Sequence, residues 1–459
     1  MKNRVTLLLL SGMLSAALEC SAQTEDHESS SVSARSPGSV LRLSLKEAVD
    51  IALGAEGNPR ARIAEETVSQ SKSRSAQARS ALLPNLEASV SQSNRTQNLQ
   101  AYGLLLRLPI AGFQFPTLVG PYGMFDARAT ASQSAFDLSA IRRYQASRTG
   151  IDQAQSENEN VQDLITGVVA RNYLAAVRTD AAVQTAGANL KLAQELLDLA
   201  SSMKAAGSAT GIEVTRARVQ LSQAQQRVLV AENERQLAYF QLLNSIGTDL
   251  TTPVELTQAL AFLPVDVTAP DLALKIAFET RNDWKSQVKR EESTELAYSA
   301  VKWERLPSVG LYGDYGTIGT SINNATPTRV YGFTVKVPVF DGGRRDARRA
   351  ESASQLRQER LRTHELRDQI DLQVRTALDN LKSSIDLVRT AEEGLTLSES
   401  ELAQAERRYK AGVGTSLEVT DAQTRLQRAR DDRILALYYY NLSRIDLGAA
   451  MGTIRRMIQ

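Results

Sequence analysis

A seven-residue repeat of apolar positions occurs twice along the chain and predicts the main elements of the fold. In the first copy these positions are Val183, Leu190 and Leu197, and 205 residues later they recur as Val388, Leu395 and Leu402. Small residues form a second ladder of heptads: Ala217, Ala224, Ala231 and Ala238, matched by Ala422, Ala429, Ala436 and Ser443. Such heptads are typical of closely packed antiparallel helices. The chain is therefore predicted to hold two helical hairpins in tandem.

Each hairpin has a sharp turn, at residues 204–217 in the first copy and 410–422 in the second. Gly412 can adopt the left-handed conformation that ends a helix. Thr415 and Glu418 have the spacing of a capping box, in which both side chains bind free backbone N–H groups at the start of the next helix. The matching residues of the first turn are Gly207, Thr210 and Glu213.

Short stretches with a period of two predict strands between the helices. Leu86, Ala88 and Val90 alternate with polar residues after Pro84, and small apolar residues alternate with polar ones again near residues 126–132. The second copy has the strongest strand pattern, with apolar side chains on one face: Tyr331, Phe333, Val335, Val337 and Val339. The stretch 99–123, between the first two strands, is expected to be a loop, although it is unusually apolar.

The patterns divide the chain into successive regions. Residues 1–22 have the basic start, apolar core and small residues of a secretory signal peptide, and residues 23–40 are a flexible polar leader. The first repeat is expected at 41–252, with strands at about 84–136. A proline-marked linker follows at 253–270, and the second repeat occupies 271–459, with strands at about 307–340. Cys20 also leaves a lipid attachment open, although Glu19 fits a lipidation motif poorly.

Composition excludes several functions. The 54 basic residues nearly balance the 52 acidic ones, so nucleic acid is not an expected partner. The two histidines, His27 and His364, lie in the leader and alone in a charged helix, so neither a catalytic triad nor a metal or cofactor site is expected. The long helical stretches are too polar to span a membrane. An exported chain of this kind would cross a membrane by strands, and four strands need further copies to close.

The chain resembles the outer-membrane efflux protein family, the TolC-like exit ducts of Gram-negative bacteria. The resemblance rests on L-S-L-K-E-A-V-D-I-A-L near the start, L-L-P-N-L and L-P-S-V before the strands, F-D-G-G-R-R after the last strand, and the paired A-G-x-x-T-x-x-E turns. It implies a mostly α-helical homotrimer in the outer membrane, with a barrel of 12 strands in the lipid and a tunnel of 12 helical segments in the periplasm. Its implied partners are an inner-membrane pump and a periplasmic adaptor.

The resemblance also assigns roles to residues at the turns. Glu418, Asp421 and Glu213 are expected to contribute to acidic rings that gate the pore, although helix capping is the expected main role of both glutamates. Gly414 stands where the family's well-studied member has an arginine that closes the gate, so Arg216 is the candidate for that ion pair, if there is one.

The turns are further expected to be the surface on which the periplasmic adaptor docks. Gly207 and Gly412 would shape the two tips, and Val413 and Leu417 would be exposed apolar side chains there. Two other classes remain as alternatives: an exported trimeric coiled-coil structural protein or adhesin, and a periplasmic adaptor. The duplicated strands argue against the first, and the lack of a recognisable lipoyl-like segment argues against the second.

Overall fold

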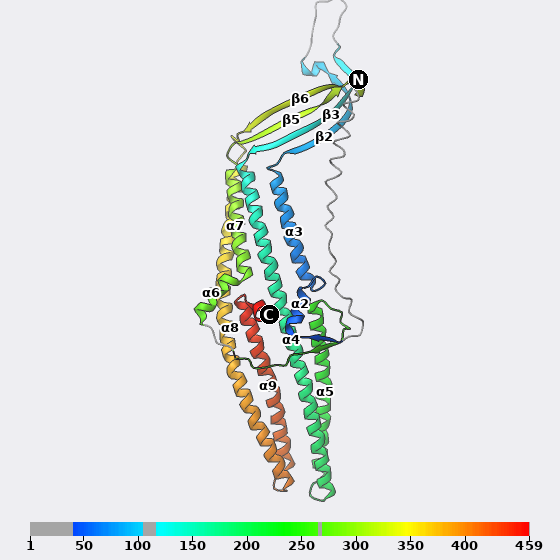
Figure 1. The fold of residues 1–459 in the computed structure, drawn as a ribbon, viewed down its shortest axis with the longest axis vertical. Helices are drawn as coiled ribbons and strands as arrows, with labels where there is room; N and C mark the ends of the chain where they lie inside the picture. Colours follow the sequence, from blue (N-terminus) through cyan, green and yellow to red (C-terminus); the bar gives the residue numbers. More distant parts are fainter. Residues whose placement is uncertain (1–39, 104–115, 265–268, 459) are drawn as a thin grey trace, which may run out of the picture. The chain divides into compact units, whose positions relative to one another are not determined.

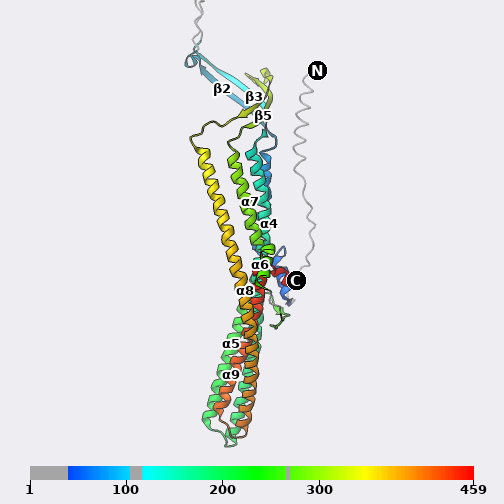
Figure 2. The same cartoon turned by 90° about the vertical axis from the view of Figure 1, so that its left-hand side faces the viewer.

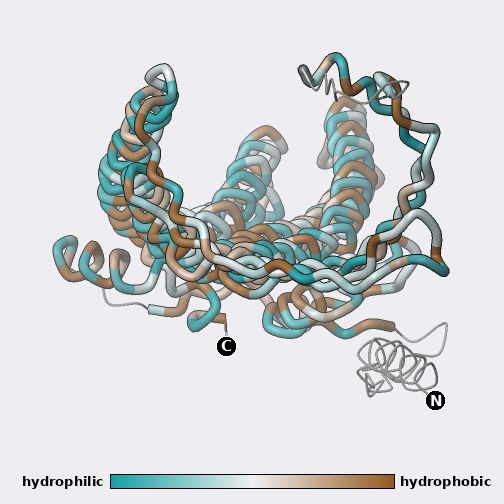
Figure 3. Tube along the Cα trace, turned by 90° about the horizontal axis from the view of Figure 1, so that it is seen from above, coloured by the Kyte–Doolittle hydropathy of each residue, from teal (hydrophilic) through white to brown (hydrophobic). Residues whose placement is uncertain are grey.

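The computed structural model describes residues 40–103, 116–264 and 269–458. The expected signal peptide, Cys20, most of the leader and residues 104–115 of the apolar stretch 99–123 lie outside these residues. From Arg42 onward the chain forms one compact unit. Among the described residues, no helix is long and apolar enough to cross a membrane. Hydrophobic and hydrophilic positions are interleaved along the helices and strands when they are viewed from above (Figure 3).

The two repeats have similar element orders. The first comprises β1 (Leu41–Leu43), α2 (Leu45–Leu53), α3 (Pro59–Ser80), β2 (Asn85–Asn98), the short 3-10 helix η2 (Leu99–Tyr102), β3 (Leu118–Phe136), α4 (Leu138–Ala205) and α5 (Gly211–Ile246). After β4 (Val254–Leu256), the second comprises α6 (Pro270–Thr280), α7 (Asn282–Trp303), β5 (Ser308–Gly319), the 3-10 turn η3 (Ile322–Asn324), β6 (Thr326–Lys336), α8 (Arg344–Lys410), α9 (Ser416–Ala450) and α10 (Ile454–Ile458).

Local sequence signals explain several helix starts. Ser44 and Glu47 form the expected reciprocal capping box at the start of α2. Asn58 caps α3, whose first residue is Pro59, a position where the missing N–H costs nothing. Asp137 caps α4 by accepting a 3.1 Å hydrogen bond from the backbone N–H of Ala140.

Four strands form one antiparallel sheet in the order β2-β3-β5-β6 (Figure 1). The register puts apolar side chains from all four strands on one face of this sheet: Leu86, Val90, Phe125, Leu311, Tyr315, Tyr331, Phe333 and Val335. The opposite face is mostly polar, with Ser89, Ser91, Asp126, Arg128, Thr130, Asp314, Thr328 and Thr334. We call these the apolar face and the polar face. Among the described residues, β2 and β6 each have one edge without a strand partner.

Three expectations from the sequence need correction. β3 begins at Leu118, inside the expected loop, because pairing with β2 keeps this glycine- and proline-containing stretch extended. β6 ends at Lys336, so Val337 and Val339 lie beyond it; Pro338 between them has no N–H to continue a ladder. The motif L-L-P-N-L predicts a helix as far as Leu83, whereas α3 ends at Ser80 and residues 81–83 form a turn that leads into Pro84, which disfavours the helical conformation at Leu83.

The linker also contains an element that the sequence did not reveal. β4 pairs with β1 in a two-stranded sheet. The Thr257 N–H and hydroxyl both donate to the carbonyl oxygen of Leu43, at 3.0 and 3.2 Å, and the Tyr173 hydroxyl donates to the same oxygen at 3.0 Å. These hydrogen bonds connect β1 to the linker through Thr257 and to the middle of α4 through Tyr173.

Two long hairpins extend away from the sheet, α4 with α5 and α8 with α9 (Figure 2). α4 has 68 residues, which correspond to about 100 Å at 1.5 Å per residue. It contacts α3, α7 and α9 as well as α5. Small residues of the expected ladder are buried in the hairpins, among them Ala224, Ala231, Ala238, Ala422 and Ala436. The tandem, mostly helical architecture expected from the sequence is therefore confirmed.

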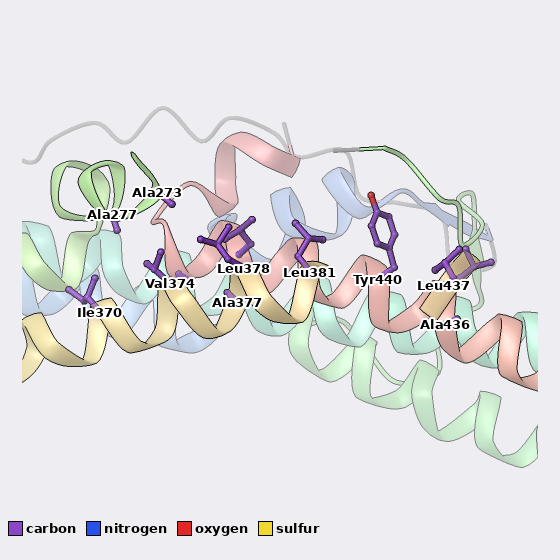
Figure 4. Packing of buried hydrophobic residues seen from close by; sticks show 13 residues of the cluster. Ala273, Ala277, Ile370, Val374, Ala377, Leu378, Leu381, Ala436, Leu437 and Tyr440 are labelled. Atoms are coloured by element: carbon purple, nitrogen blue, oxygen red, sulfur yellow. The ribbon is translucent and has the colours of Figure 1, made fainter. Parts of the chain in front are cut away.

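One extensive part of the core joins α6, α8 and α9 (Figure 4). Ile370, Val374, Leu378 and Leu381 recur at helical spacing on one side of α8 and are almost fully buried. They pack against Ala273 and Ala277 of α6, and against a row on α9 that includes Leu437 and Tyr440. A smaller cluster near the tips joins the second hairpin to α4 and includes Leu402, Tyr409 and Leu426.

Candidate functional site

The two hairpin tips have the glycine geometry expected from the sequence. The backbone φ angle is +75° at Gly207 and +72° at Gly412, both in the left-handed region. In the second tip the Val413 N–H donates to the carbonyl oxygen of Arg408 at 3.0 Å, and in the first the Ser208 N–H donates to that of Met203 at 2.9 Å. These bonds satisfy carbonyl groups that the helix ends leave free. Both turns are therefore sharply defined.

Gly414 is required by a close approach within the second tip. Its N–H also donates to the Arg408 carbonyl, at 3.1 Å. A Cβ atom at residue 414 would lie 2.9 Å from the Arg408 Cβ and 3.1 Å from backbone atoms of Arg408 and Tyr409. This turn therefore leaves too little room for an arginine at residue 414. Arg408 itself brings a guanidinium to this tip, where it donates to the carbonyl oxygen of Val413 at 3.3 Å.

Glu213 joins the two hairpins. One oxygen of its carboxylate accepts hydrogen bonds from the Thr210 N–H and hydroxyl, at 3.3 and 3.1 Å. The other accepts a 2.7 Å hydrogen bond from the hydroxyl of Tyr409 on α8. The Tyr409 hydrogen bond is the main cause of a lowered pKa for Glu213, and the charge of Arg216 contributes to it. Burial, followed by the contact with Glu213, raises the pKa of Tyr409 to about 12.

Glu418 and Asp421 lie one turn apart on α9, and each is paired with an arginine of its own hairpin. The Thr415 hydroxyl accepts the Glu418 N–H at 3.3 Å, as expected for a cap. The Glu418 carboxylate, however, lies 3.3 Å from Nε of Arg408. Asp421 pairs with Arg425, which also lies 2.6 Å from Glu401 of α8. The tip thus brings the expected carboxylates together with two arginines that the sequence analysis did not select.

Apolar side chains are exposed at both tips. Val413 and Leu417 are 69% and 62% exposed, in agreement with the prediction, and Ile212 in the first tip is 59% exposed. Ile212 was missed, although the 205-residue offset relates it to Leu417. The same offset relates Arg408 and Tyr409 to Met203 and Lys204. The side chains that link the tips therefore occur at positions where the two repeats differ, and such differences could have indicated them in the sequence.

Within the described parts of the chain, no group of three His, Cys, Asp or Glu side chains is placed to hold a metal ion. His364 is exposed on α8, 3.2 Å from the Asp368 carboxylate.

The family model for outer membrane efflux proteins matches residues 53–248 and 273–453, one segment in each repeat. The chain belongs to the outer membrane efflux protein family. Its matched segments include both hairpins and all four strands of the large sheet.

Individual members of the efflux family agree with this assignment. The chain is 25% identical over 327 residues to the pyoverdine export outer membrane protein OpmQ of Pseudomonas putida, covering 67% of this chain and 66% of OpmQ, slightly under two thirds of that relative. Its fold resembles the CmeC outer membrane channel of Campylobacter jejuni, with a TM-score of 0.78 at 17% identity over 89% of this chain and 86% of CmeC. The outer membrane protein VceC of Vibrio cholerae gives a TM-score of 0.77 at 16% identity, over 89% and 96% of the two chains.

Proposed function

We propose that the protein is the outer-membrane exit duct of a tripartite efflux or type I secretion system. It conducts substrates passively from an inner-membrane pump and a periplasmic adaptor to the exterior. The observation that carries this proposal is the division of the four-stranded sheet into an apolar and a polar face.

The apolar face has the properties of a surface in contact with lipid. Leu86, Tyr331 and Phe333 are 77%, 82% and 71% exposed, values that few large apolar side chains have in water-soluble proteins. Alternation of lipid-facing apolar residues with polar residues is the pattern of strands that line a transmembrane pore. The sheet would therefore lie in the outer membrane with its polar face toward a lumen.

The arrangement of edges supports a ring of several copies. Near the sheet, the helices contact one another in the order α3-α4-α7-α8; in the hairpins α4 packs against α5 and α9, and α9 packs against α8. One side of the chain is therefore formed by β2, α3 and the outer face of α5, and the other by β6 and the outer face of α8, although the tips of α5 and α8 meet through Glu213 and Tyr409. Joining the second side of one copy to the first side of the next is a heterologous contact, which closes into a ring. We propose a homotrimer, in which three four-stranded sheets complete a 12-stranded barrel.

Exposed leucines provide apolar surface on both of these sides. Leu229 on α5 is 67% exposed and lies two residues from buried Ala231, hence on the opposite side of the helix. Leu397 on α8 is 64% exposed and lies two residues from Leu395, which packs into the tip cluster. A neighbouring copy would bury both leucines.

The helical tips would then form the periplasmic end of the duct. Ile212, Val413 and Leu417 would provide the docking surface for the adaptor, shaped by Gly207 and Gly412. Glu418, Asp421 and Glu213 would line the gate, where Arg408 and Arg425 balance the carboxylates and Arg216 lies close to Glu213.

The proposal is tested by the assembly state. Protein extracted from outer membranes in detergent should have the mass of three chains by light scattering, and carbonate should not release it from membranes. Leu229→Arg should reduce the trimer to monomers, since it would place a charge in the apolar contact, whereas Leu229→Ala should keep most of it. A wild-type protein that carbonate releases would instead favour the exported coiled-coil alternative.

A further inference from the structure

Three charged side chains form a cluster on the polar face of the sheet. The guanidinium of Arg128, on β3, donates to both carboxylate oxygens of Asp126, at 2.7 and 2.6 Å. Its third nitrogen lies 3.7 Å from the carboxylate of Asp314, on the neighbouring strand β5. The side chains of Arg128, Asp126 and Asp314 are 31%, 19% and 18% exposed. One arginine thus lies between two partly buried carboxylates.

The strand register builds this cluster. Asp126 and Arg128 are two residues apart on one strand and so share a face, and Arg128 is paired with Gly316 on β5. A Cβ atom at Gly316 would lie 2.5 Å from the Cβ of Arg128, so this position cannot carry a side chain without a shift of the strands. The guanidinium therefore reaches diagonally past the glycine to Asp314. On the other side Arg128 is paired with Ser89, another small residue.

The cluster lies at mid-height of the sheet and must face the lumen of the proposed duct. Asp314 is near the centre of β5 (Ser308–Gly319), and Arg128 is near the centre of β3 (Leu118–Phe136). The cluster puts three charges together on one face, whereas Arg329 is the charged residue that the strand register places on the apolar face. Clustered charges are stabilised where they meet water, so the polar face is the one that lines the lumen. This step rests on the proposed function, because it needs the sheet to lie in the membrane.

Arg128 sets the charge balance of this wall. On the polar face of the described strands, the acidic residues are Glu87, Asp126 and Asp314, and the basic residues are Arg95, Arg128 and Lys336. Without Arg128, Asp126 and Asp314 of each copy would lack their cation on the wall, at two levels, because Asp126 pairs with Ile318 and Asp314 with Thr130. In a trimer this makes two rings of three carboxylates, one on each side of residue 128, which would attract multivalent cations and repel anions.

We propose that Arg128 is a selectivity-determining residue of the exit lumen. By neutralising Asp126 and Asp314 it keeps the barrel wall free of unpaired carboxylates that would bind cations, so that negatively charged solutes pass the exit as readily as neutral ones. A purely structural ion pair would affect stability but would leave ion block of the pore unchanged. The readout must therefore be lumen charge rather than stability.

The test uses full-length trimers in planar lipid bilayers, with hexaamminecobalt(III) as the trivalent cation, added to one side at a time. Arg128→Gln should lower the half-blocking concentration at least about tenfold when the cation is added on the sheet side. It should change little when the cation is added on the tip side. The matched control is Arg329→Gln, which removes an arginine from the apolar face of β6. The triple variant with Asp126→Asn, Asp314→Asn and Arg128→Gln has no charged side chain in the cluster. Its half-blocking concentration should return to the wild-type value.

A second variant reverses the sign of the charge on the lumen wall. Its result can be interpreted even if the Arg128→Gln protein does not fold. Asp126→Asn with Asp314→Asn leaves Arg128 without its carboxylates, and it should make the pore sensitive to a trivalent anion added on the sheet side. Arg128→Gln trimers blocked at the wild-type concentration, within twofold, would overturn the role of Arg128 while leaving the duct intact. Wild-type protein that forms no ion-conducting pores would overturn the proposed function itself, and this inference with it.

Discussion

The hydroxyl of Tyr409 on α8 donates a 2.7 Å hydrogen bond to the carboxylate of Glu213 on α5, and this bond links the tips of the two hairpins. Tyr409 is 6% exposed and packs in the apolar cluster that joins the second hairpin to α4. The bond therefore combines a fixed donor with a charged acceptor at the end of the chain where the gate is proposed.

Tyr409→Phe should weaken the contact between the tips, while the aromatic side chain at residue 409 should keep its packing in the apolar cluster. A hydrogen bond to a charged group is worth about 1.5–3 kcal/mol when buried, and partial exposure of Glu213 reduces this to about 1 kcal/mol. Hydrogen exchange at the amides of the two turns should then become about five times faster. Glu213→Gln combined with Tyr409→Phe should cost less than the sum of the two single variants. Additive effects would mean that the side chains act independently.

The same bond should persist over a wide pH range. The folded-state pKa of Glu213 is lowered, so its contribution is present at neutral pH and is lost as the pH falls through that lowered pKa. The pKa of Tyr409 is raised to about 12, so its contribution is present below its unfolded value and is lost as the pH rises through about 12. Exchange protection that depends on Tyr409 should therefore be flat between about pH 5 and pH 10. A midpoint near neutrality would contradict this assignment.

Gly412→Val should strain the second tip. A branched side chain at φ +72° costs about 1–2 kcal/mol, so exchange at the turn should accelerate and export should fall, while the trimer and the barrel persist. Gly394→Ala is the matched control, because it lies within α8 and an added Cβ there meets nothing within 4 Å. The control should stabilise α8 by about 0.5–1 kcal/mol. Normal export by Gly412→Val would argue against a role for the tip geometry.

Two substitutions at the gate should shift ion selectivity in opposite directions. Arg408→Gln removes the partner of Glu418 and should make the pore more cation-selective in bilayer recordings. Glu418→Gln with Asp421→Asn should make it less so, because it removes the carboxylates. Unchanged selectivity in the double variant would refute an acidic gate. Capping itself should survive, since the Thr415 hydroxyl rather than the Glu418 carboxylate satisfies the N–H group at the start of α9.

Charge at the exposed tip residues should prevent docking. Ile212→Glu with Leu417→Glu should abolish crosslinking of the duct to its periplasmic adaptor in cells, since both side chains are apolar and more than half exposed. Ser222→Glu, at an exposed position of α5 about three turns from the tip, is the control and should crosslink normally. Equal crosslinking by the two variants would place the docking surface elsewhere.

Periodicity predicted the local structure better than the long-range partners. Heptads located the hairpins, and the glycine and threonine at each turn specified its geometry, because helix ends are determined by nearby residues. The alternation around Tyr331 identified the apolar face of β6. It could not reveal that β3 pairs with β5, since alternation says which side chains share a face and not which strand lies beside them. β1 and β4, with three residues each, are too short to give any periodic signal.

At the tips the sequence predicted the carboxylates but not their partners. Arg408 and Glu418 lie ten residues apart, and Tyr409 and Glu213 lie 196 apart. Such contacts depend on how the turn folds back and how the two hairpins align, which no local pattern records.

The proposed function depends most directly on the orientation of the sheet in the membrane, with its apolar face toward lipid and its polar face toward the lumen. Phe333 and Thr334 are neighbours on β6 with opposite facing, since Phe333 pairs with Leu311 on the apolar face and Thr334 pairs with Gly310 on the polar face. The decisive measurement compares outer-membrane assembly of Phe333→Arg and Thr334→Arg, as carbonate-resistant trimer per cell. The account predicts that Phe333→Arg fails to assemble, because it adds a second charge to the lipid-facing side of β6, which already carries Arg329, and that Thr334→Arg assembles normally. Equal assembly of the two variants, or failure of Thr334→Arg alone, would contradict it.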